Sequence, residues 1–223
     1  MDAKPDHYFG TPREELLPFM PADAATVLEI GCGDGVFGRQ LKERGASEVW
    51  GVEIVEAAAE RAGKVLDKVL VGDIAKLVDE LPLGYFDLVV ANDVLEHLVD
   101  PYTLLDKLKD HLSRRGVVVS SIPNIRYYPI FRQLLLHKKW QYEETGILDW
   151  THLRFFTVRS IREMYEGLGY EVLRHEGINP MPDRARAFHL ANFLLRGRLS
   201  DMKYVEFATV ARPIRTLETA EAG

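Results

Sequence analysis

The sequence lacks most of the features that mark a secreted or membrane-embedded protein. A single cysteine, Cys32, excludes an internal disulfide and a multi-cysteine metal site. No run of about 18 apolar residues is present, which is the length that a membrane-spanning helix needs. The first ten residues also lack the apolar segment of a secretory signal. We therefore expect no membrane span and a cytoplasmic location.

The composition is typical of a folded globular protein. Hydrophobic residues make up 47% of the chain and charged residues 28%, which argues against extensive disorder. With 223 residues and no internal repeat, the chain is long enough for one domain with an elaboration. We expect a single domain over residues 1–211 and a flexible tail over residues 212–223.

Charge is divided unevenly along the chain. The net charge of −6 disfavours a nucleic-acid partner. Residues 1–122 carry 13 Lys and Arg against 22 Asp and Glu, a net charge of −9, whereas residues 123–203 carry a net charge of +4. Two interpretations remain open at this stage. The charges are scattered over a solvated surface, or a basic cap covers a site for an anionic substrate.

Short apolar segments alternate with amphipathic ones, which predicts an α/β fold with a mainly parallel sheet. Strands are expected over residues 26–30, 48–53, 68–71, 85–91, 116–122, 170–176 and 203–211. Helices are expected over residues 12–20, 35–44, 55–66, from Pro101 to Leu112, and over residues 125–137, 157–167 and 185–197. The expected fold is a Rossmann-like, seven-stranded, mostly parallel sheet with helices on both faces. Residues 123–156 and 179–202 would form a helical and aromatic cap after the fifth strand.

A glycine-rich turn follows the first predicted strand, and glycines there let a ligand approach the backbone closely. The spacing of Gly33, Gly35 and Gly38 matches the G-x-G-x-x-G fingerprint of dinucleotide-binding proteins. The same turn also matches E-x-G-x-G-x-G, from Glu29 to Gly35, which resembles the motif by which class I methyltransferases bind S-adenosylmethionine. The turn by itself leaves both cofactors open.

Polar residues after the next strands distinguish the two cofactors. Glu53 ends the second strand, where a carboxylate can accept hydrogen bonds from ribose hydroxyls. Asp73 follows the third strand in Gly-Asp-Ile, where it can accept a hydrogen bond from an adenine amino group. The fourth strand runs directly into Asn92-Asp-Val-Leu-Glu-His-Leu98. All lie at carboxyl ends of strands, where open α/β sheets bind ligands.

Taken in order over residues 25–175, the motifs VLEIGCGDG, GVE, GDI, FDLVVANDVLEHL and GVVVSSIPN resemble those of class I S-adenosylmethionine-dependent methyltransferases. The Pro-Asn after the fifth strand and the sequence DWTHLRFFT are similar to two related groups. One is the small methyltransferases of sugar- and polysaccharide-modifying clusters, and the other is the methyltransferase-fold accessory proteins of methionine biosynthesis. The resemblance implies S-adenosylmethionine as cofactor and S-adenosylhomocysteine as product.

The resemblance also assigns cofactor-binding roles to residues at the carboxyl ends of the first four strands and in the N-terminal arm. These residues are Tyr8, Glu29, Gly31, Cys32, Gly33, Glu53, Ile54, Asp73, Ile74, Asn92 and Val94. No group of His, Asp or Glu has convincing ligand spacing, so we expect no metal.

An alcohol acceptor must lose a proton during methylation, and a histidine near neutral pH can accept it. His152 is the first candidate for this base, with Asp149 placed to orient its ring, and His97 is the second. Arg126 and Arg154 could hold an anionic group with paired donors. The predicted substrate-binding residues are Asn124, Arg126, Tyr127, Asp149 and Arg154.

These observations predict a methyltransferase that methylates oxygen on a sugar, a nucleotide-sugar or a glycan. The expected partner is therefore a small or carbohydrate acceptor, anionic in character, with no nucleic acid involved and a monomer or homodimer as the assembly. Two alternatives remain. The chain is a methyltransferase acting on a quinone precursor, an amine or another small metabolite, or it is a methyltransferase-fold partner protein that transfers no methyl group.

Overall fold

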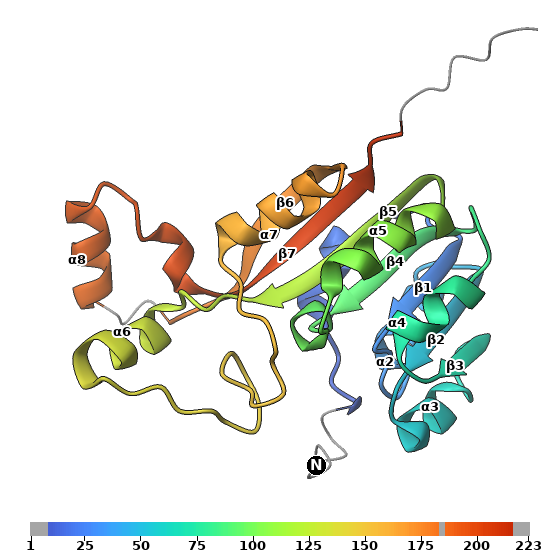
Figure 1. The fold of residues 1–223 in the computed structure, drawn as a ribbon, viewed down its shortest axis with the longest axis horizontal. Coiled ribbons are helices and arrows are strands. Elements are labelled where there is room, and N and C mark those ends of the chain that lie inside the picture. Colours follow the sequence, from blue (N-terminus) through green and yellow to red (C-terminus); the bar gives the residue numbers. More distant parts are fainter. Residues whose placement is uncertain (1–8, 183–185, 216–223) are drawn as a thin grey trace, which may run out of the picture.

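The computed structural model describes residues 9–182 and 186–215. Seven strands form one sheet in the order β3-β2-β1-β4-β5-β7-β6 (Figure 1). Among these strands only β7 runs antiparallel to its neighbours, β5 and β6, which confirms the mostly parallel sheet predicted from the sequence. The strands are β1 (Thr26–Ile30), β2 (Glu48–Glu53), β3 (Lys68–Val71), β4 (Phe86–Asn92), β5 (Leu112–Pro123), β6 (Tyr170–Pro180) and β7 (Tyr204–Pro213).

The helices lie where the sequence predicted them, with ends that differ by up to four residues. They are η1 (Glu14–Phe19), α2 (Val36–Glu43), α3 (Glu56–Ala62), α5 (Pro101–His111), α6 (Tyr128–His137), α7 (Val158–Gly167) and α8 (Arg186–Leu194). Short helical segments that the sequence did not indicate are α4 (Ile74–Leu77), η2 (Val78–Glu80), η3 (Leu95–His97) and η4 (Ser200–Lys203). The predicted cap of α7 is confirmed, because the Thr157 hydroxyl accepts a hydrogen bond from Ser160 N–H in a capping box.

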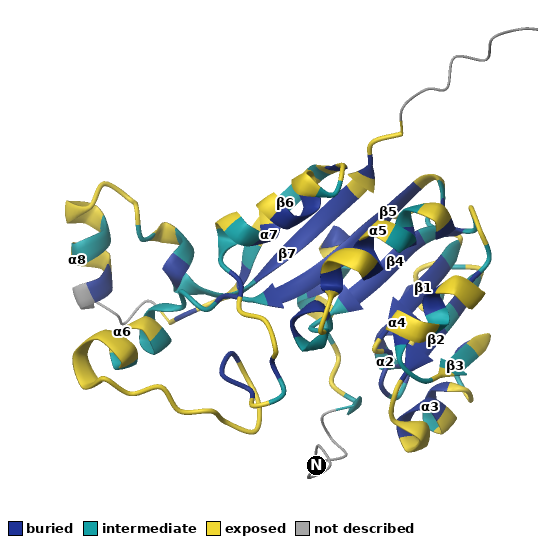
Figure 2. Cartoon of the chain, viewed as in Figure 1, coloured by how far each residue is buried: buried dark blue, intermediate teal, exposed yellow. Residues whose placement is uncertain are grey.

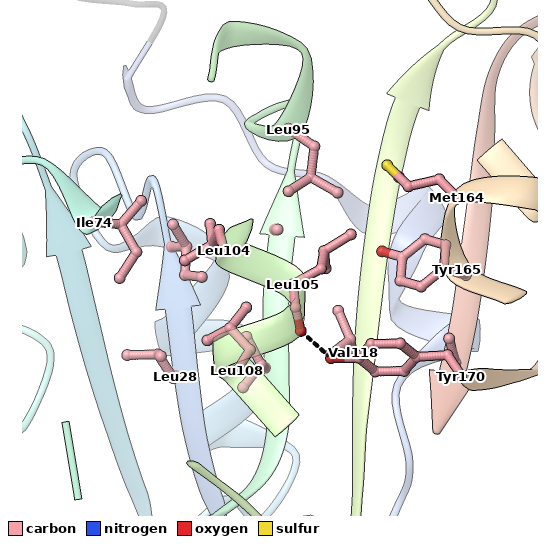
Figure 3. Packing of buried hydrophobic residues seen from close by; sticks show 14 of the residues in the cluster. Leu28, Ile74, Leu95, Leu104, Leu105, Leu108, Val118, Met164, Tyr165 and Tyr170 are labelled. Atoms are coloured by element: carbon pink, nitrogen blue, oxygen red, sulfur yellow. Dashed lines mark hydrogen bonds between the residues drawn. The ribbon is translucent and has the colours of Figure 1, made fainter. Parts of the chain in front are cut away.

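Both faces of the sheet are covered, because side chains of a strand alternate between its two faces. On one face, Leu28 and Val118 pack against α5 and α7, and Figure 1 shows these two helices in front of the sheet. On the other face, Val27 and Val119 pack with residues of η1 and α2. Figure 3 shows the first of these clusters, in which the Tyr170 hydroxyl donates a hydrogen bond to the carbonyl of Leu105.

The helices α6 and α8 form a separate lobe beyond the ends of β5 and β7 (Figure 1). We call residues 124–137 and 186–203 the helical lobe. Its small core contains Phe188 and Met202, packed against Tyr127 and Tyr128. Figure 2 colours much of both helices as exposed, and large apolar residues are among the exposed ones. The exposed set is Phe131, Leu134, Leu135, Leu136, Leu190, Phe193 and Leu194.

The predicted start of the flexible tail is wrong. The flexible tail was expected to begin at residue 212, but Arg212 and Pro213 continue β7 and pair with Glu171 and Tyr170 of β6. These backbone hydrogen bonds to the edge strand extend the sheet two residues beyond the predicted end. The remainder of the predicted tail, from residue 216 on, lies outside the described residues. Within the described part of the chain, no helix has the length and apolar character needed to cross a membrane.

The contact between α5 and the sheet predicts a stability effect. Leu105 is completely buried in the cluster of Figure 3. Leu105→Ala leaves a cavity there and should lower the free energy of unfolding by about 2–5 kcal/mol. The control Leu83→Ala removes a side chain that is 75% exposed, so it should change stability by less than about 0.5 kcal/mol. Chemical denaturation of the two variants measures the difference, and equal stabilities would contradict this packing.

Candidate functional site

A cavity of about 970 Å³ opens at the carboxyl ends of β1, β2 and β4. Its volume lies near the upper end of the range of about 300–1,000 Å³ that is usual for small-molecule sites. In the sheet, β1 lies between β2 and β4, so the strands that follow β1 in the sequence lie first on one side of it and then, from β4 on, on the other. The cavity therefore lies at the point where the strand order reverses. Ligands of open α/β sheets bind at such points.

The glycine turn after β1 forms one wall of this cavity. Gly31, Gly33 and Gly35 have φ angles of +70°, +51° and +76°, a left-handed conformation that side chains disfavour. A Cβ on Gly33 would lie 2.5 Å from the carbonyl oxygen of Phe9, and one on Gly31 would lie 2.7 Å from a methyl carbon of Val94. The glycines are therefore required by backbone conformation and by close packing.

The carboxylate of Glu53 joins this turn to the end of β2. One of its oxygens accepts a hydrogen bond from Gly33 N–H at 2.9 Å, and the other accepts one from Val55 N–H at 2.9 Å. A carboxylate has about four lone-pair sites, so further acceptor capacity remains beside the cavity, which Glu53 lines. Ile54, 69% exposed, lines the cavity next to it and offers an apolar surface for a flat ring.

Two further predicted residues lie on the same wall. Asp73 lines the cavity and starts α4, because its carboxylate accepts a hydrogen bond from Ala75 N–H at 2.9 Å. Asn92, at the end of β4, has a buried side-chain amide with no hydrogen-bond partner among the described residues. Buried polar groups are nearly always paired. Because Asn92 also lines the cavity, its amide is placed to bond a polar ligand there.

All the predicted cofactor residues inside the described chain therefore line one cavity. Tyr8 lies outside the described residues, but its neighbour Phe9 and also Thr11 line the cavity. Glu29 lies at its base, where burial raises the pKa of the carboxyl to about 8. Burial also raises the pKa of the Cys32 thiol, so this thiol is neutral and behaves as a small apolar side chain.

The two candidate histidines lie against each other, with ring centroids 4.6 Å apart. His97 lines the cavity. Its Nδ1 is 3.1 Å from the hydroxyl of Thr151, and this hydroxyl donates a hydrogen bond to Asp149 at 2.7 Å. Asp149, which was expected to orient His152, thus acts on His97 through Thr151.

His152 lies behind His97 and is only 9% exposed. Its Nδ1 is 3.1 Å from the carbonyl oxygen of Ile147, and its Nε2 is 3.9 Å from the carboxylate of Glu96. His152, the first candidate for the base, is therefore buried, whereas His97, the second candidate, lies on the cavity wall. The catalytic role of either residue stays a prediction.

Three of the predicted substrate residues lie in the helical lobe. The Asn124 amide donates hydrogen bonds to the carbonyls of Asp201 and Tyr204, and Arg126 forms an ion pair with Asp201 at 3.2 Å. Tyr127 packs against the lobe's core. Their contacts hold the lobe to β7, and none of them is among the described residues that line the cavity.

The loop from α6 to α7 returns from the lobe to the cavity. Its Trp150 and Thr151 line the cavity wall. Arg154, the remaining predicted substrate residue, donates a hydrogen bond to the carbonyl of Val99 and so ties this loop to the segment after β4. The substrate roles of the lobe and loop residues stay predictions.

Sequence reasoning missed Arg13 and Glu96. Arg13 lines the cavity and forms ion pairs with Asp93, with Glu206 at 2.6 Å and with Glu15 at 2.7 Å. Two of these partners are 80 and 193 residues away along the chain, so no local pattern could have revealed them. Glu96 did have a signal, since it directly precedes His97 in the segment after β4.

Comparisons with known proteins agree with this geometry. A family model described as a methyltransferase domain matches residues 5–175. A curated relative is the ubiquinone biosynthesis O-methyltransferase of Cereibacter sphaeroides, 24% identical over 180 residues. That match covers 76% of this chain and 66% of the relative, which is slightly less than two thirds of the relative's length.

Two solved structures show the same fold. A SAM-dependent methyltransferase from Archaeoglobus fulgidus has a TM-score of 0.68 at 22% identity, with 89% of this chain and 91% of that chain covered. The plantazolicin methyltransferase, solved with a desmethyl analogue and SAH, has a TM-score of 0.59 at 16% identity, with 84% of this chain and 76% of that chain covered.

The buried carboxyl of Glu29 predicts a pH dependence. Its pKa of about 8 in the folded protein lies above the ordinary value of 4.5, so the folded protein keeps a proton that the unfolded chain loses. Stability should therefore fall as the pH rises from about 4.5 to about 8, by on the order of 1.4 kcal/mol per pH unit for this group. Glu29→Gln does not titrate, so the variant should gain stability relative to the parent across this window.

Denaturant unfolding of both proteins at pH 5, 6.5 and 8 measures this effect. Any contribution from Glu206, whose pKa burial also raises to about 8, is present in both proteins and cancels in the difference. A stability difference between parent and variant that stays constant from pH 5 to pH 8 would contradict the raised pKa of Glu29.

Proposed function

The chain belongs to the methyltransferase domain family, and from this membership we propose that it transfers a methyl group from S-adenosylmethionine to a hydroxyl oxygen of a small acceptor. Family and fold agree with the class I methyltransferase resemblance seen in the sequence, which is thereby confirmed. The finer resemblance to enzymes of carbohydrate-modifying clusters stays a prediction.

One observation carries the proposal: a single cavity gathers the glycine turn, the carboxylates of Glu53 and Asp73, and the unpaired amide of Asn92. Carboxylates suit the hydroxyls of a ribose and the amino group of an adenine, and the amide suits the polar methionine end of the same cofactor. When bound, S-adenosylmethionine supplies a methyl group on a sulfonium, which is open to in-line attack. The protein contributes alignment, which is worth several kcal/mol.

The acceptor's proton must leave as its oxygen gains the methyl group. His97 is the candidate residue that lines the cavity, and Thr151 and Asp149 hold its Nδ1 side. With Nδ1–H donating to the Thr151 hydroxyl, Nε2 of His97 carries the lone pair. We therefore place the acceptor hydroxyl beside His97, with His152 supporting it from behind.

Two classes of hydroxyl acceptor fit this arrangement. A phenolic hydroxyl, as in a quinone precursor, is favoured because the ubiquinone biosynthesis enzyme is similar to 76% of this chain. A carbohydrate hydroxyl is favoured by the sequence resemblance and by Trp150, which lines the cavity and is 44% exposed, as a stacking surface for a sugar would be. The anionic character expected of the acceptor has less support, because Arg126 and Arg154 bond to the protein itself.

Cofactor binding provides the first test. Glu53→Ala removes a charged acceptor and also releases Gly33 N–H, so it should weaken binding of S-adenosylhomocysteine by about 1–3 kcal/mol. Glu56→Ala changes an exposed carboxylate three residues away and should leave this affinity unchanged. Isothermal titration calorimetry measures both. Tight binding of NAD with no binding of S-adenosylhomocysteine would refute the proposed cofactor.

Turnover provides the second test, with a panel of phenolic and carbohydrate hydroxyl acceptors. His97→Ala should lower kcat by about 10²–10⁴-fold on the accepted substrate while S-adenosylhomocysteine affinity is retained. His137→Ala, in the exposed last residue of α6, is the matched control and should keep full activity. If His97→Ala keeps kcat and only His152→Ala loses it, the placement of the acceptor beside His97 is wrong. Cofactor binding with no turnover on any acceptor would favour the partner-protein alternative.

A further inference from the structure

Glu96 is the most unusual buried group near the cavity. It is 1% exposed, and neither of its carboxylate oxygens has a hydrogen-bond partner among the described residues. A buried carboxylate without a partner is costly unless it is paired or coordinates a metal.

The neighbouring charges do not remove this cost. Asp93 and Glu206 are charged groups near Glu96, and Arg13 is the cation near them. Arg13 is itself committed to ion pairs with Asp93 and Glu206. Three carboxyl groups thus gather around one guanidinium.

Two histidines complete a set of ligand atoms around Glu96. One ligand atom from each of Glu96, His97 and His152 lies within 4.8 Å of the others. Nε2 of His152 is 3.9 Å from the carboxylate, which is too long for a hydrogen bond. The same separation is shorter than about 4.2 Å, twice the usual bond between zinc and a nitrogen or oxygen ligand, so one ion between the two atoms could bond both.

The surroundings of the two rings match those of metal-binding histidines. Nδ1 of His152 faces the carbonyl oxygen of Ile147, and Nδ1 of His97 faces the hydroxyl and carbonyl of Thr151. In metal sites the second ring nitrogen usually donates its proton to such an oxygen, which orients the ring and leaves the other nitrogen for the metal. This assigns Nε2 of His152, the nitrogen 3.9 Å from the Glu96 carboxylate, as its ligand atom, and by the same argument we assign Nε2 of His97.

We propose that Glu96, His97 and His152 bind a divalent transition metal ion of the zinc type at the wall of the cavity. Two imidazoles and one carboxylate favour such an ion over calcium or magnesium, which take oxygen ligands. The sequence did not reveal these three residues as a ligand set, because Glu96 and His97 are adjacent and His152 is 55 residues further along the chain, a spacing that belongs to no common motif.

The bound ion could also take part in methyl transfer by binding the acceptor, and this role rests on the proposed function. Three protein ligands leave a coordination position open, as in catalytic zinc sites. His97 lines the cavity, so this position faces the region in which we place the acceptor. A hydroxyl oxygen bound to the ion would lose its proton more readily, since a metal ion lowers the pKa of oxygen ligands. In the metal-bound form Nε2 of His97 is a ligand and does not act as the base, so the proton passes to solvent or to a carboxylate, and no redox change occurs.

Metal binding can be tested without any acceptor. The chelator-treated full chain is titrated with Zn²⁺ in a calorimeter, and with Co²⁺ while visible absorption is recorded. We expect one ion per chain and a Co²⁺ spectrum typical of four or five ligands. Glu96→Gln and His152→Gln should weaken Zn²⁺ binding by more than about 100-fold, which exceeds the effect of losing a residue that only supports a ligand. His137→Gln, an exposed histidine in the lobe, should bind as the parent does.

Binding of S-adenosylhomocysteine to each variant reports separately on folding and on the proposed function. A parent chain that binds neither Zn²⁺ nor Co²⁺, or a Glu96→Gln variant that binds Zn²⁺ within about threefold of the parent, would overturn the metal site. If Glu96→Gln fails to fold, the variant His97→Asn, on the cavity wall, replaces it in this test. Zn²⁺ binding by His97→Asn within about threefold of the parent would then overturn the metal site. Loss of Zn²⁺ binding in the variants, together with a parent that does not bind S-adenosylhomocysteine, would leave the metal site standing and refute the proposed function.

Discussion

The hydrogen bonds of the Glu53 carboxylate with the backbone N–H groups of Gly33 and Val55 are the interaction on which the cavity depends. They connect the glycine turn after β1 to the segment after β2, two loops whose strands are neighbours in the sheet. The left-handed glycines let the turn approach this carboxylate, and the buried Glu29 lies against Gly38 in α2, the helix that follows the turn. One wall of the cavity is thereby set before any ligand binds, which reduces the ordering cost of binding.

The opposite wall has a different origin. It consists of the segment after β4 and the loop that returns from the helical lobe, and its charged groups come from distant parts of the chain. Arg13 brings the N-terminal arm against Asp93 and Glu206, and Arg154 ties the returning loop to Val99. This wall contains the Glu96, His97 and His152 cluster. One wall thus carries most of the residues predicted to bind the cofactor, whereas the other carries the histidines predicted to act on the acceptor and comes partly from the appended segments, as is usual for functions built onto a common fold.

The helical lobe shows how little composition alone decides. Its positive charge and aromatic residues left open a cap over an anionic substrate, and in the structure Arg126 is paired with Asp201 and Tyr127 packs against the small core of the lobe. The same residue types serve equally well in a substrate site and in a small hydrophobic core. Figure 1 shows α6 and α8 extending away from the sheet, and the loop with Trp150 and Thr151, rather than these helices, reaches the cavity.

The sequence by itself determined the sheet, the order of its elements and the cofactor wall. Apolar runs and glycine turns act over a few residues, and the carboxyl ends of parallel strands meet at one edge, so Glu53, Asp73 and Asn92 could be placed together from their positions after strands. Only the tertiary structure decided that Arg13 faces Asp93 and Glu206, that Asp149 acts on His97 through Thr151, and that Glu96 is buried beside two histidines with no hydrogen-bond partner for its carboxylate among the described residues. Contacts of this kind join residues tens to hundreds of positions apart, and their energies come from burial and from charge separation, which no local pattern of residues records.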